Sequence, residues 1–336
     1  ADLINDQAGA SIATVNGAKT IHIWDIAGAP QQEFLPDLAG SAPVAISPDG
    51  RLIAYLAEST TSGDRVLQLW EVDAGLQFQA PDGFGGTTDQ LAFSPDGRTI
   101  LSSFSPYRDK PEPVQIWTLD GKEWATLAGH HSSARRVAYT ADSATIVSAG
   151  DDGTLKVWDS ERNELQTLRG HTDRAHSVEI APDNQTIVSA SEDGTIKLWN
   201  LKTGQQQLSL DAGKPVYSAK ITPDGKSIVA NVGNEMLQVW DLETATLQQT
   251  HSKHAGPFLF TPDGNNIVSY NGSHITVRDR KSGQIRLTVP AESRIAACQL
   301  LPDGQTLVLV EISGIIHQLR LHGLIAPTPS EEPSLP

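Results

Sequence analysis

The sequence predicts an all-β protein built from repeated four-stranded antiparallel units. The first observation is a short strand motif, such as LKVWD or IKLWN, whose tryptophan recurs at intervals of 46, 47, 41, 41 and 41 residues. The tryptophans are Trp24, Trp70, Trp117, Trp158, Trp199 and Trp240. A second motif, Pro-Asp-Gly, recurs in phase with the first, and no stretch has sustained helical periodicity. A repeat of about 40 residues with these features indicates a modular β architecture.

Within one repeat the predicted elements follow a fixed order. A Pro-Asp-Gly turn separates the first two strands, because Pro fixes φ, Asp caps the turn and Gly accepts a positive φ. These turns lie at 47–50, 94–97, 222–225, 261–264 and 301–304, with Asn in place of Gly at 181–184 and a weaker copy at 140–143. The tryptophan strand comes third, and a short run such as ELQTL provides a fourth, outer strand.

Two further units lack the tryptophan and place Arg278 and Leu319 in its position, which gives eight units in 336 residues. One four-stranded sheet of this size cannot cover both of its faces, whereas sheets stacked radially cover one another. The sequence therefore predicts a propeller of eight four-stranded antiparallel blades, with seven blades as the alternative.

Residues 129–159 and 170–200 carry the repeat most completely, from Gly-His through Asp-Gly to the tryptophan strand. On these residues the chain resembles the WD-repeat β-propeller family, and bacterial WD-repeat proteins in particular, over about residues 1–326. The resemblance implies a single propeller domain at 1–326, followed by a Pro/Ser/Glu-rich tail at 327–336 that is expected to be disordered. The expected blades are 1–38, 39–86, 87–129, 130–170, 171–211, 212–250, 251–290 and 291–326.

The resemblance also implies a hydrogen-bonded quartet of His, Ser, Asp and Trp in a blade. Blade 4 offers His130, Ser148, Asp152 and Trp158, and blade 5 offers His171, Ser189, Asp193 and Trp199 at identical spacing. A Ser-His-Asp set also resembles a catalytic triad, but a nucleophile needs open space beside an oxyanion site. We expect these groups to be packed between strands as a structural network.

Other blades depart from the quartet. Blade 6 has Ala212, Ala230 and Asn234 at the matching positions. Blade 7 keeps His251 and Ser269 but has Arg278 in place of the tryptophan. These departures predict looser packing in blades 1 and 6–8, unless apolar contacts substitute.

The family's usual contact surface is the face that carries the loops between blades, at the mouth of the central channel. The position just before the innermost strand is large in four consecutive blades, and longer loops of blades 2 and 3 lie beside them. The candidate partner-binding residues are Phe84, Asp89, Tyr107, Arg108, Arg135, His176 and Tyr217. Aromatic and Arg side chains dominate binding hot spots. The alternative is that Tyr217 and His176 pack against neighbouring blades and that Arg135 forms a surface ion pair.

The composition excludes several classes of function. The net charge of −15 argues against nucleic acid as a partner, and no apolar run is long enough for a membrane-spanning helix. The single Cys298 excludes an internal disulfide. Neither His130–His131 nor His251–His254 has zinc spacing, so no metal and no cofactor are expected.

The sequence thus predicts a non-catalytic, cytoplasmic scaffold that binds proteins or peptides, acidic or phosphorylated ones among them. One alternative is a sensor or interaction module of a longer multidomain signalling protein. The other is a hydrolase at the channel mouth.

Overall fold

A computed structural model describes most of the chain. The described residues are 4–5, 11–15, 21–25, 30–34, 44–48, 52–58, 65–71, 75–79, 88–104, 114–119, 124–233, 236–252, 256–271, 274–290, 295–300, 306–311 and 316–320. All regular structure in these residues is β-strand, and every strand pairing is antiparallel. The all-β prediction is confirmed. No helix in the described ranges is long and apolar enough to span a membrane.

The first four sheets, which we call blades 1–4, have four strands each. Blade 1 contains β1 (Ile4–Asn5), β2 (Ser11–Val15), β3 (Ile21–Asp25) and β4 (Pro30–Phe34). Blade 2 contains β5 (Val44–Ile46), β6 (Leu52–Glu58), β7 (Arg65–Glu71) and β8 (Gly75–Gln79). Blade 3 contains β9 (Thr88–Phe93), β10 (Thr99–Phe104), β11 (Val114–Thr118) and β12 (Trp124–Leu127). Blade 4 contains β13 (Ala134–Tyr139), β14 (Thr145–Gly150), β15 (Leu155–Asp159) and β16 (Glu164–Leu168).

Blades 5–8 continue the series. Blade 5 contains β17 (Ala175–Ile180), β18 (Thr186–Ser191), β19 (Thr195–Asn200) and β20 (Gln206–Asp211). Blade 6 contains β21 (Val216–Ile221), β22 (Ser227–Val232), β23 (Met236–Asp241) and β24 (Thr246–Ser252). Blade 7 contains β25 (Phe258–Phe260), β26 (Asn266–Asn271), β27 (His274–Asp279) and β28 (Ile285–Pro290). Blade 8 contains β29 (Ile295–Leu300), β30 (Thr306–Glu311) and β31 (Ile316–Arg320).

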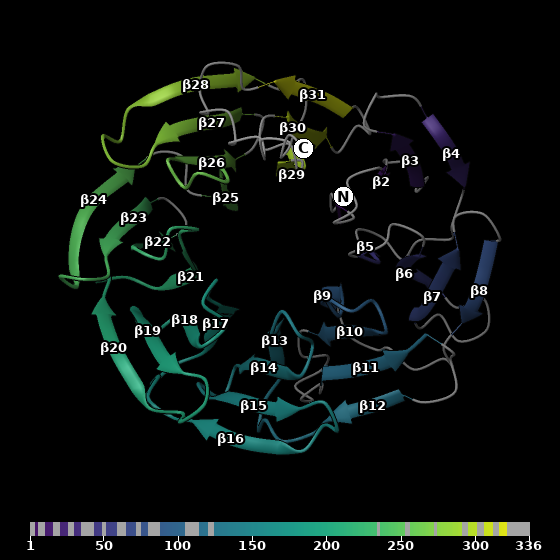
Figure 1. The fold of residues 1–336 in the computed structure, drawn as a ribbon, viewed down its shortest axis with the longest axis horizontal. Helices are drawn as coiled ribbons and strands as arrows, with labels where there is room; N and C mark the ends of the chain where they lie inside the picture. The colour runs from purple at the N-terminus through teal and green to yellow at the C-terminus, as the bar shows by residue number, and fades with distance from the viewer. Residues whose placement is uncertain are drawn as a thin grey trace, which may run out of the picture.

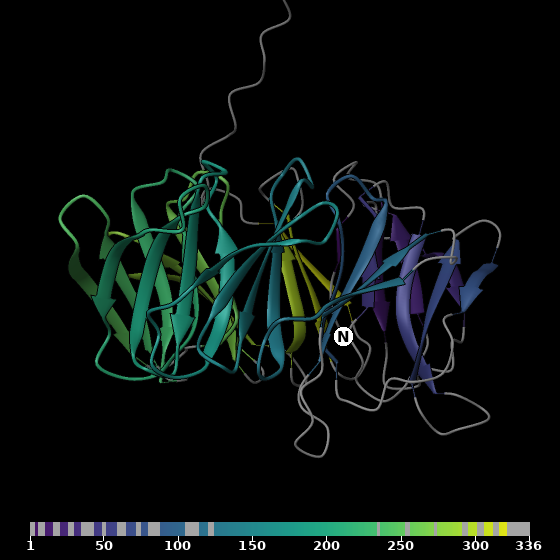
Figure 2. The same cartoon turned by 90° about the horizontal axis from the view of Figure 1, so that it is seen from below.

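The sheets follow one another around a ring, with the first strand of each sheet innermost and the last strand at the rim (Figure 1). Seen from the side, the strands run between the two faces of the ring, and the turns lie on those faces (Figure 2). The described strands form seven four-stranded sheets and one three-stranded sheet. The segment expected to supply the outer strand of blade 8 lies outside the described residues, so the count of eight complete blades stays a prediction.

The turns between first and second strands use one local device. In blade 6, Thr222 Oγ1 donates to Asp224 Oδ1 at 2.5 Å, and the same oxygen accepts the backbone N–H of Lys226 at 3.1 Å. Gly225 has φ +69°, and Asn184 takes the same place in blade 5 with φ +56°. Asp therefore caps the turn while a residue that tolerates positive φ closes it.

The core lies between neighbouring blades. Val157 of blade 4 packs in one cluster with Val178, Ile187 and Trp199 of blade 5, and all four side chains are buried. The alternation of side chains along each strand sends one set toward each adjacent sheet, so every blade covers the face of its neighbour.

Candidate functional site

The quartet of blade 5 forms a continuous hydrogen-bonded chain. His171 Nε2 lies 2.8 Å from Ser189 Oγ, and His171 Nδ1 lies 2.8 Å from Asp193 Oδ2. Trp199 Nε1 donates to Ser189 Oγ at 2.9 Å. The Asp193 carboxylate accepts from Nδ1–H, so Nε2 accepts the Ser189 proton while Ser189 accepts from the tryptophan. Every group in this chain is thereby satisfied with a neutral histidine.

The charge states agree with this assignment. Burial lowers the pKa of His171, more than Asp193 raises it. Burial alone would raise the pKa of Asp193, but hydrogen bonds from Thr195, from the backbone N–H of Thr172 and from His171 together lower it to about 2. A neutral imidazole therefore sits against an ionised carboxylate over the neutral pH range.

Blade 4 repeats this geometry. His130 Nε2 lies 2.8 Å from Ser148 Oγ, Trp158 Nε1 donates to the same oxygen at 3.0 Å, and His130 Nδ1 lies 3.1 Å from Asp152 Oδ1. Burial opposes ionisation of Asp152, but hydrogen bonds from His130 and Thr154 outweigh it and hold its pKa well below the usual range.

The sequence reasoning missed a fifth member of each network. Thr154 Oγ1 donates to Asp152 at 2.7 Å, and Thr195 Oγ1 donates to Asp193 at 2.6 Å. The signal was available, since both repeats carry Thr directly after Asp-Gly. A threonine two residues after a turn aspartate is well placed to bond its carboxylate.

The environment of the blade 5 quartet does not suit nucleophilic catalysis. Ser189 and the His171 side chain have 0% exposure, and that of Asp193 has 6%. The serine oxygen is already engaged by both Trp199 and His171. A substrate carbonyl therefore has no approach to the one hydroxyl that the histidine activates.

Blade 6 supports its tryptophan differently. Ala230 occupies the register position of Ser189, and Trp240 Nε1 donates instead to Gln238 Oε1 at 3.2 Å. Gln238 Nε2 in turn donates to the Ala212 carbonyl at 3.2 Å. Around them, Ala212, Ala230 and Trp240 belong to an apolar cluster shared with blade 5. Asn234 lies outside the described residues.

Blade 7 does not rebuild the quartet, and the prediction for His251 is wrong. The register of β24 sets His251 opposite Leu237, where the neighbouring blades carry Leu168 and Leu210. Among the described residues, buried His251 Nε2 has no hydrogen-bond partner. Burial, and then the nearby Arg278, lower the pKa of His251 to about 4. Arg278, in the tryptophan position, donates to the Gly283 carbonyl at 2.8 Å.

The predicted contact residues occupy an unexpected backbone feature. They were placed just before the innermost strands, but Asp89, Arg135, His176 and Tyr217 lie within them. In each case the strand register skips this residue, so that it is the extra residue of a β-bulge. Bulges re-aim a side chain out of the pleat, which presents these positions at one face of the ring.

Two of the bulged side chains meet acidic residues of their own blade. Arg135 binds Asp151 through two hydrogen bonds, Nε to Oδ1 at 2.5 Å and Nη2 to Oδ2 at 3.0 Å. His176 Nε2 lies 2.7 Å from Glu192 Oε1. The next blade contributes Tyr217, whose ring centroid lies 5.1 Å from that of His176. The alternative of an ion pair and inter-blade packing therefore describes these contacts, and the side chains stay partly exposed at the face.

The contacts of the remaining candidates stay predictions. Phe84, Tyr107 and Arg108 lie outside the described residues. Asp89 is described only as a residue of β9. Among the described residues, no three His, Cys, Asp or Glu side chains gather into a potential metal site.

Comparison with known proteins agrees with the fold. The family described as "WD domain, G-beta repeat" matches residues 121–159 and 162–200, which include the tryptophan strands of blades 4 and 5. Meiotic recombination protein rec14 of Schizosaccharomyces pombe (strain 972 / ATCC 24843) is 28% identical over 138 residues. That stretch covers 39% of this chain and 41% of the rec14 protein, so the similarity spans less than half of either.

Together the repeats and the four-stranded sheets define the class. The chain carries WD repeats on an all-β fold of the WD-repeat β-propeller type, as the sequence predicts. WD-repeat proteins are typically non-enzymatic scaffolds for protein–protein interaction.

Proposed function

We propose that residues 1–326 form a non-catalytic scaffold that binds a protein or peptide at the face carrying the bulged residues. The observation that carries this proposal is the repeated bulge in blades 3 to 6, at Asp89, Arg135, His176 and Tyr217. A bulge turns a side chain out of the pleat, and those of Arg135, His176 and Tyr217 are partly exposed. Three of them are large and held by neighbours, so little side-chain entropy is lost when a partner binds.

The charge pattern of this face bears on the partner. Asp151 already neutralises Arg135, so an acidic partner would have to compete with a two-point ion pair. Arg174 is more available, since its side chain is 50% exposed and its closest carboxylate, on Glu192, lies at 4.0 Å. Together with Arg108, which the sequence predicts as a contact residue, Arg174 supports binding of acidic or phosphorylated peptides by the same face.

The buried quartets favour this scaffold over a hydrolase. They place the Ser-His-Asp sets inside the blades, where they stabilise the strands that carry the bulges. The channel-mouth candidates for catalysis are likewise engaged, since His176 contacts Glu192 and Tyr217. The contacts of these side chains therefore favour a role in binding a partner over a role in proton transfer.

The test is the double variant Arg108→Glu with Tyr217→Ala. Arg135 is left in place, because a glutamate there would face Asp151 and destabilise the blade. We expect affinity capture with mass spectrometry to lose the wild-type set of partners, while a cooperative thermal transition shows that the variant still folds. The matched control is Ile285→Ser, an exposed residue on the outer strand of blade 7, which should retain them. An unchanged set with the double variant would place the interface elsewhere.

A further inference from the structure

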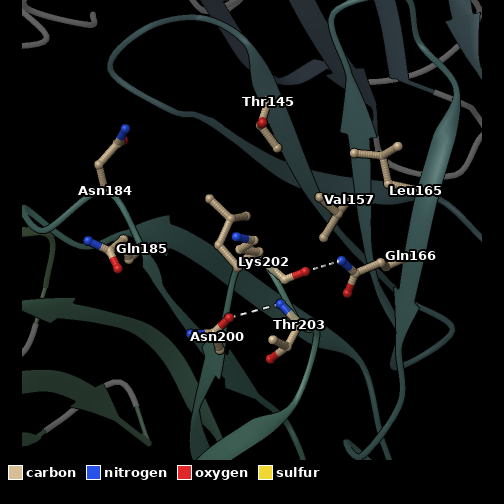
Figure 3. A pocket seen from close by; sticks show the side chains of 10 residues that line it. Thr145, Val157, Leu165, Gln166, Asn184, Gln185, Asn200, Lys202 and Thr203 are labelled. Atoms are coloured by element: carbon tan, nitrogen blue, oxygen red, sulfur yellow. Dashed lines mark hydrogen bonds between the residues drawn. The ribbon is translucent and has the colours of Figure 1, made fainter.

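A groove opens between blades 4 and 5 on the face opposite the bulged residues. Its cavity volume is about 530 Å³, within the range of small-ligand and side-chain pockets. On one side lie Asn184 and Gln185, from the first turn of blade 5, and on the other lie Leu165 and Gln166 of β16 (Figure 3). Gln166 Nε2 donates to the Lys202 carbonyl at 2.9 Å, so the two blades are tied together along the groove.

Leu165 gives the groove an unusual apolar edge. It is the extra residue of a bulge in β16, and the corresponding bulges of β20, β24 and β28 carry Gln207, Gln248 and Arg286. In blades 6 and 7 that polar side chain bonds an aspartate of its own blade, Gln248 to Asp241 and Arg286 to Asp279. Leu165 has no polar group to be held in this way and is 54% exposed.

The other walls hold amides and a cation. At the end of the third strand, blades 4, 6 and 7 carry Asp159, Asp241 and Asp279, whereas blade 5 carries Asn200. Asn200 Oδ1 still caps the turn by accepting the Thr203 N–H at 2.8 Å. The second carboxylate oxygen is replaced by an N–H₂ group. Among the described residues that line the groove there is no carboxylate, and Lys202 carries the one formal charge.

The amide and lysine side chains of the groove have N–H groups that can bond a ligand. Asn184 Oδ1 accepts the Ala141 N–H at 3.0 Å, which holds the amide in place across the blades. Within the described residues, no acceptor is bonded by the side-chain N–H groups of Asn184, Gln185 or Asn200, and Lys202 makes no ion pair. Side-chain donors around an aliphatic surface fit a ligand that offers acceptors beside an apolar group.

We propose that this groove is a second binding site, for an extended segment of a partner protein that carries an aliphatic side chain next to an acidic one. The aliphatic side chain packs on Leu165 and Leu201, while the amides bond the backbone carbonyls of the segment. Its carboxylate lies near Lys202. Charge selects this occupant. The chain as a whole has a net charge of −15, whereas the described lining of the groove has a lysine and no carboxylate. An acidic segment is therefore favoured at the groove. The described lining residues include no aromatic ring on which a sugar could stack.

The test uses a fluorescein-labelled peptide, Gly-Glu-Leu-Glu-Gly, in fluorescence anisotropy with the full chain. We expect it to bind about tenfold more tightly than Gly-Glu-Ala-Glu-Gly, from burial of the larger side chain. The Gly-Lys-Leu-Lys-Gly peptide should bind about tenfold more weakly, since it brings cations to Lys202. Added salt should weaken binding of the acidic peptide.

Two variants of the chain locate the site. Leu165→Gln should weaken binding about tenfold, and it should fold normally because Gln207 and Gln248 occupy the same bulge in other blades. Lys202→Glu should weaken it to a similar degree. Leu247→Gln is the matched control, since Leu247 is 43% exposed on blade 6 and outside the groove. The proposal is overturned if the acidic leucine peptide does not bind, if Leu165→Gln binds it as wild type does, or if the lysine peptide binds equally well.

Discussion

Blades 5 and 6 are neighbours with the same strand order, yet they satisfy their buried tryptophans by different means. Trp199 bonds Ser189 within a chain that continues through His171 to Asp193. Trp240 bonds Gln238, which reaches the Ala212 carbonyl. The comparison teaches that the fold requires a partner for the indole N–H rather than one particular quartet, because an unsatisfied buried donor is what costs stability.

The interface between blades 6 and 7 is the contrasting case. There His251 takes a position that is leucine in blades 4 and 5, and its Nε2 is buried without a partner. Arg278 adds a positive charge beside it. The interface retains two buried polar side chains without the aspartate that pairs with histidine in blades 4 and 5, so we expect it to be the weaker one.

The largest expected effect comes from removing the carboxylate of blade 5. Asp193→Ala leaves the donors of His171, Thr195 and the Thr172 backbone without their acceptor, and should lower the free energy of unfolding by about 2–3 kcal/mol. Urea denaturation measures this at pH 7. Asp173→Ala, on an exposed aspartate of the same blade, should change it by less than about 0.5 kcal/mol.

The pH dependence gives a second readout of the same substitution. The folded pKa of Asp193, about 2, lies below its ordinary value of 3.8, so its contribution is complete above that ordinary value. As the pH falls through the folded pKa, the carboxylate protonates in both states and the contribution is lost. The difference between wild type and Asp193→Ala should therefore shrink as the solution is acidified from pH 4 toward pH 2. A difference that stays constant over this range would contradict the hydrogen-bonded carboxylate.

The next predicted effect is an increase in the free energy of unfolding, at the weaker interface between blades 6 and 7. His251→Leu restores the leucine of the neighbouring blades and removes the unpartnered nitrogen, so it should stabilise the protein by about 1 kcal/mol at pH 8. The folded pKa of His251, about 4, lies below the ordinary 6.5, so wild type loses stability as the pH falls from 6.5 toward 4. At pH 5 the gain should be about 2 kcal/mol larger than at pH 8.

Denaturant titrations at both pH values test this gain, with His131→Leu as the control. His131 is exposed, and its replacement should change the free energy of unfolding by less than about 0.5 kcal/mol. Equal gains from His251→Leu at the two pH values would show that the buried imidazole titrates normally.

The sequence was sufficient to predict the elements that repeat from blade to blade. It was insufficient to predict the positions at which the strand register departs from the repeat. The turns and the spacing of His171, Ser189 and Asp193 follow from side-chain chemistry that is local or periodic. The bulge at His176 does not, since it depends on how β17 pairs with β18. His251 was misplaced for the same reason, because counting residues across a loop cannot show which strand residue faces Leu237.

The groove between blades 4 and 5 could not be predicted from the sequence, for a further reason. It is formed by Leu165 and Asn200, which lie on different blades and depart from the repeat by one side chain each. Either departure alone is an ordinary surface substitution. Their meaning depends on the contact between the blades, which no pattern within a single repeat contains.

The last two changes exchange the residues that distinguish blades 5 and 6, and the smallest effect is expected for the change in blade 6. Ser189→Ala should cost about 1–2 kcal/mol, because Trp199 Nε1 loses its acceptor and His171 Nε2 loses its donor. Ala230→Ser, the reverse change in blade 6, should also cost about 0.5–1 kcal/mol rather than stabilise. The new hydroxyl would be fully buried, and Ala212 and Gly213, which follow β20, offer no side chain to accept its proton. Paired denaturation curves test both changes. Stabilisation by Ala230→Ser would mean that a serine suffices on its own, and that the histidine and aspartate of blade 5 add nothing to the support of its tryptophan.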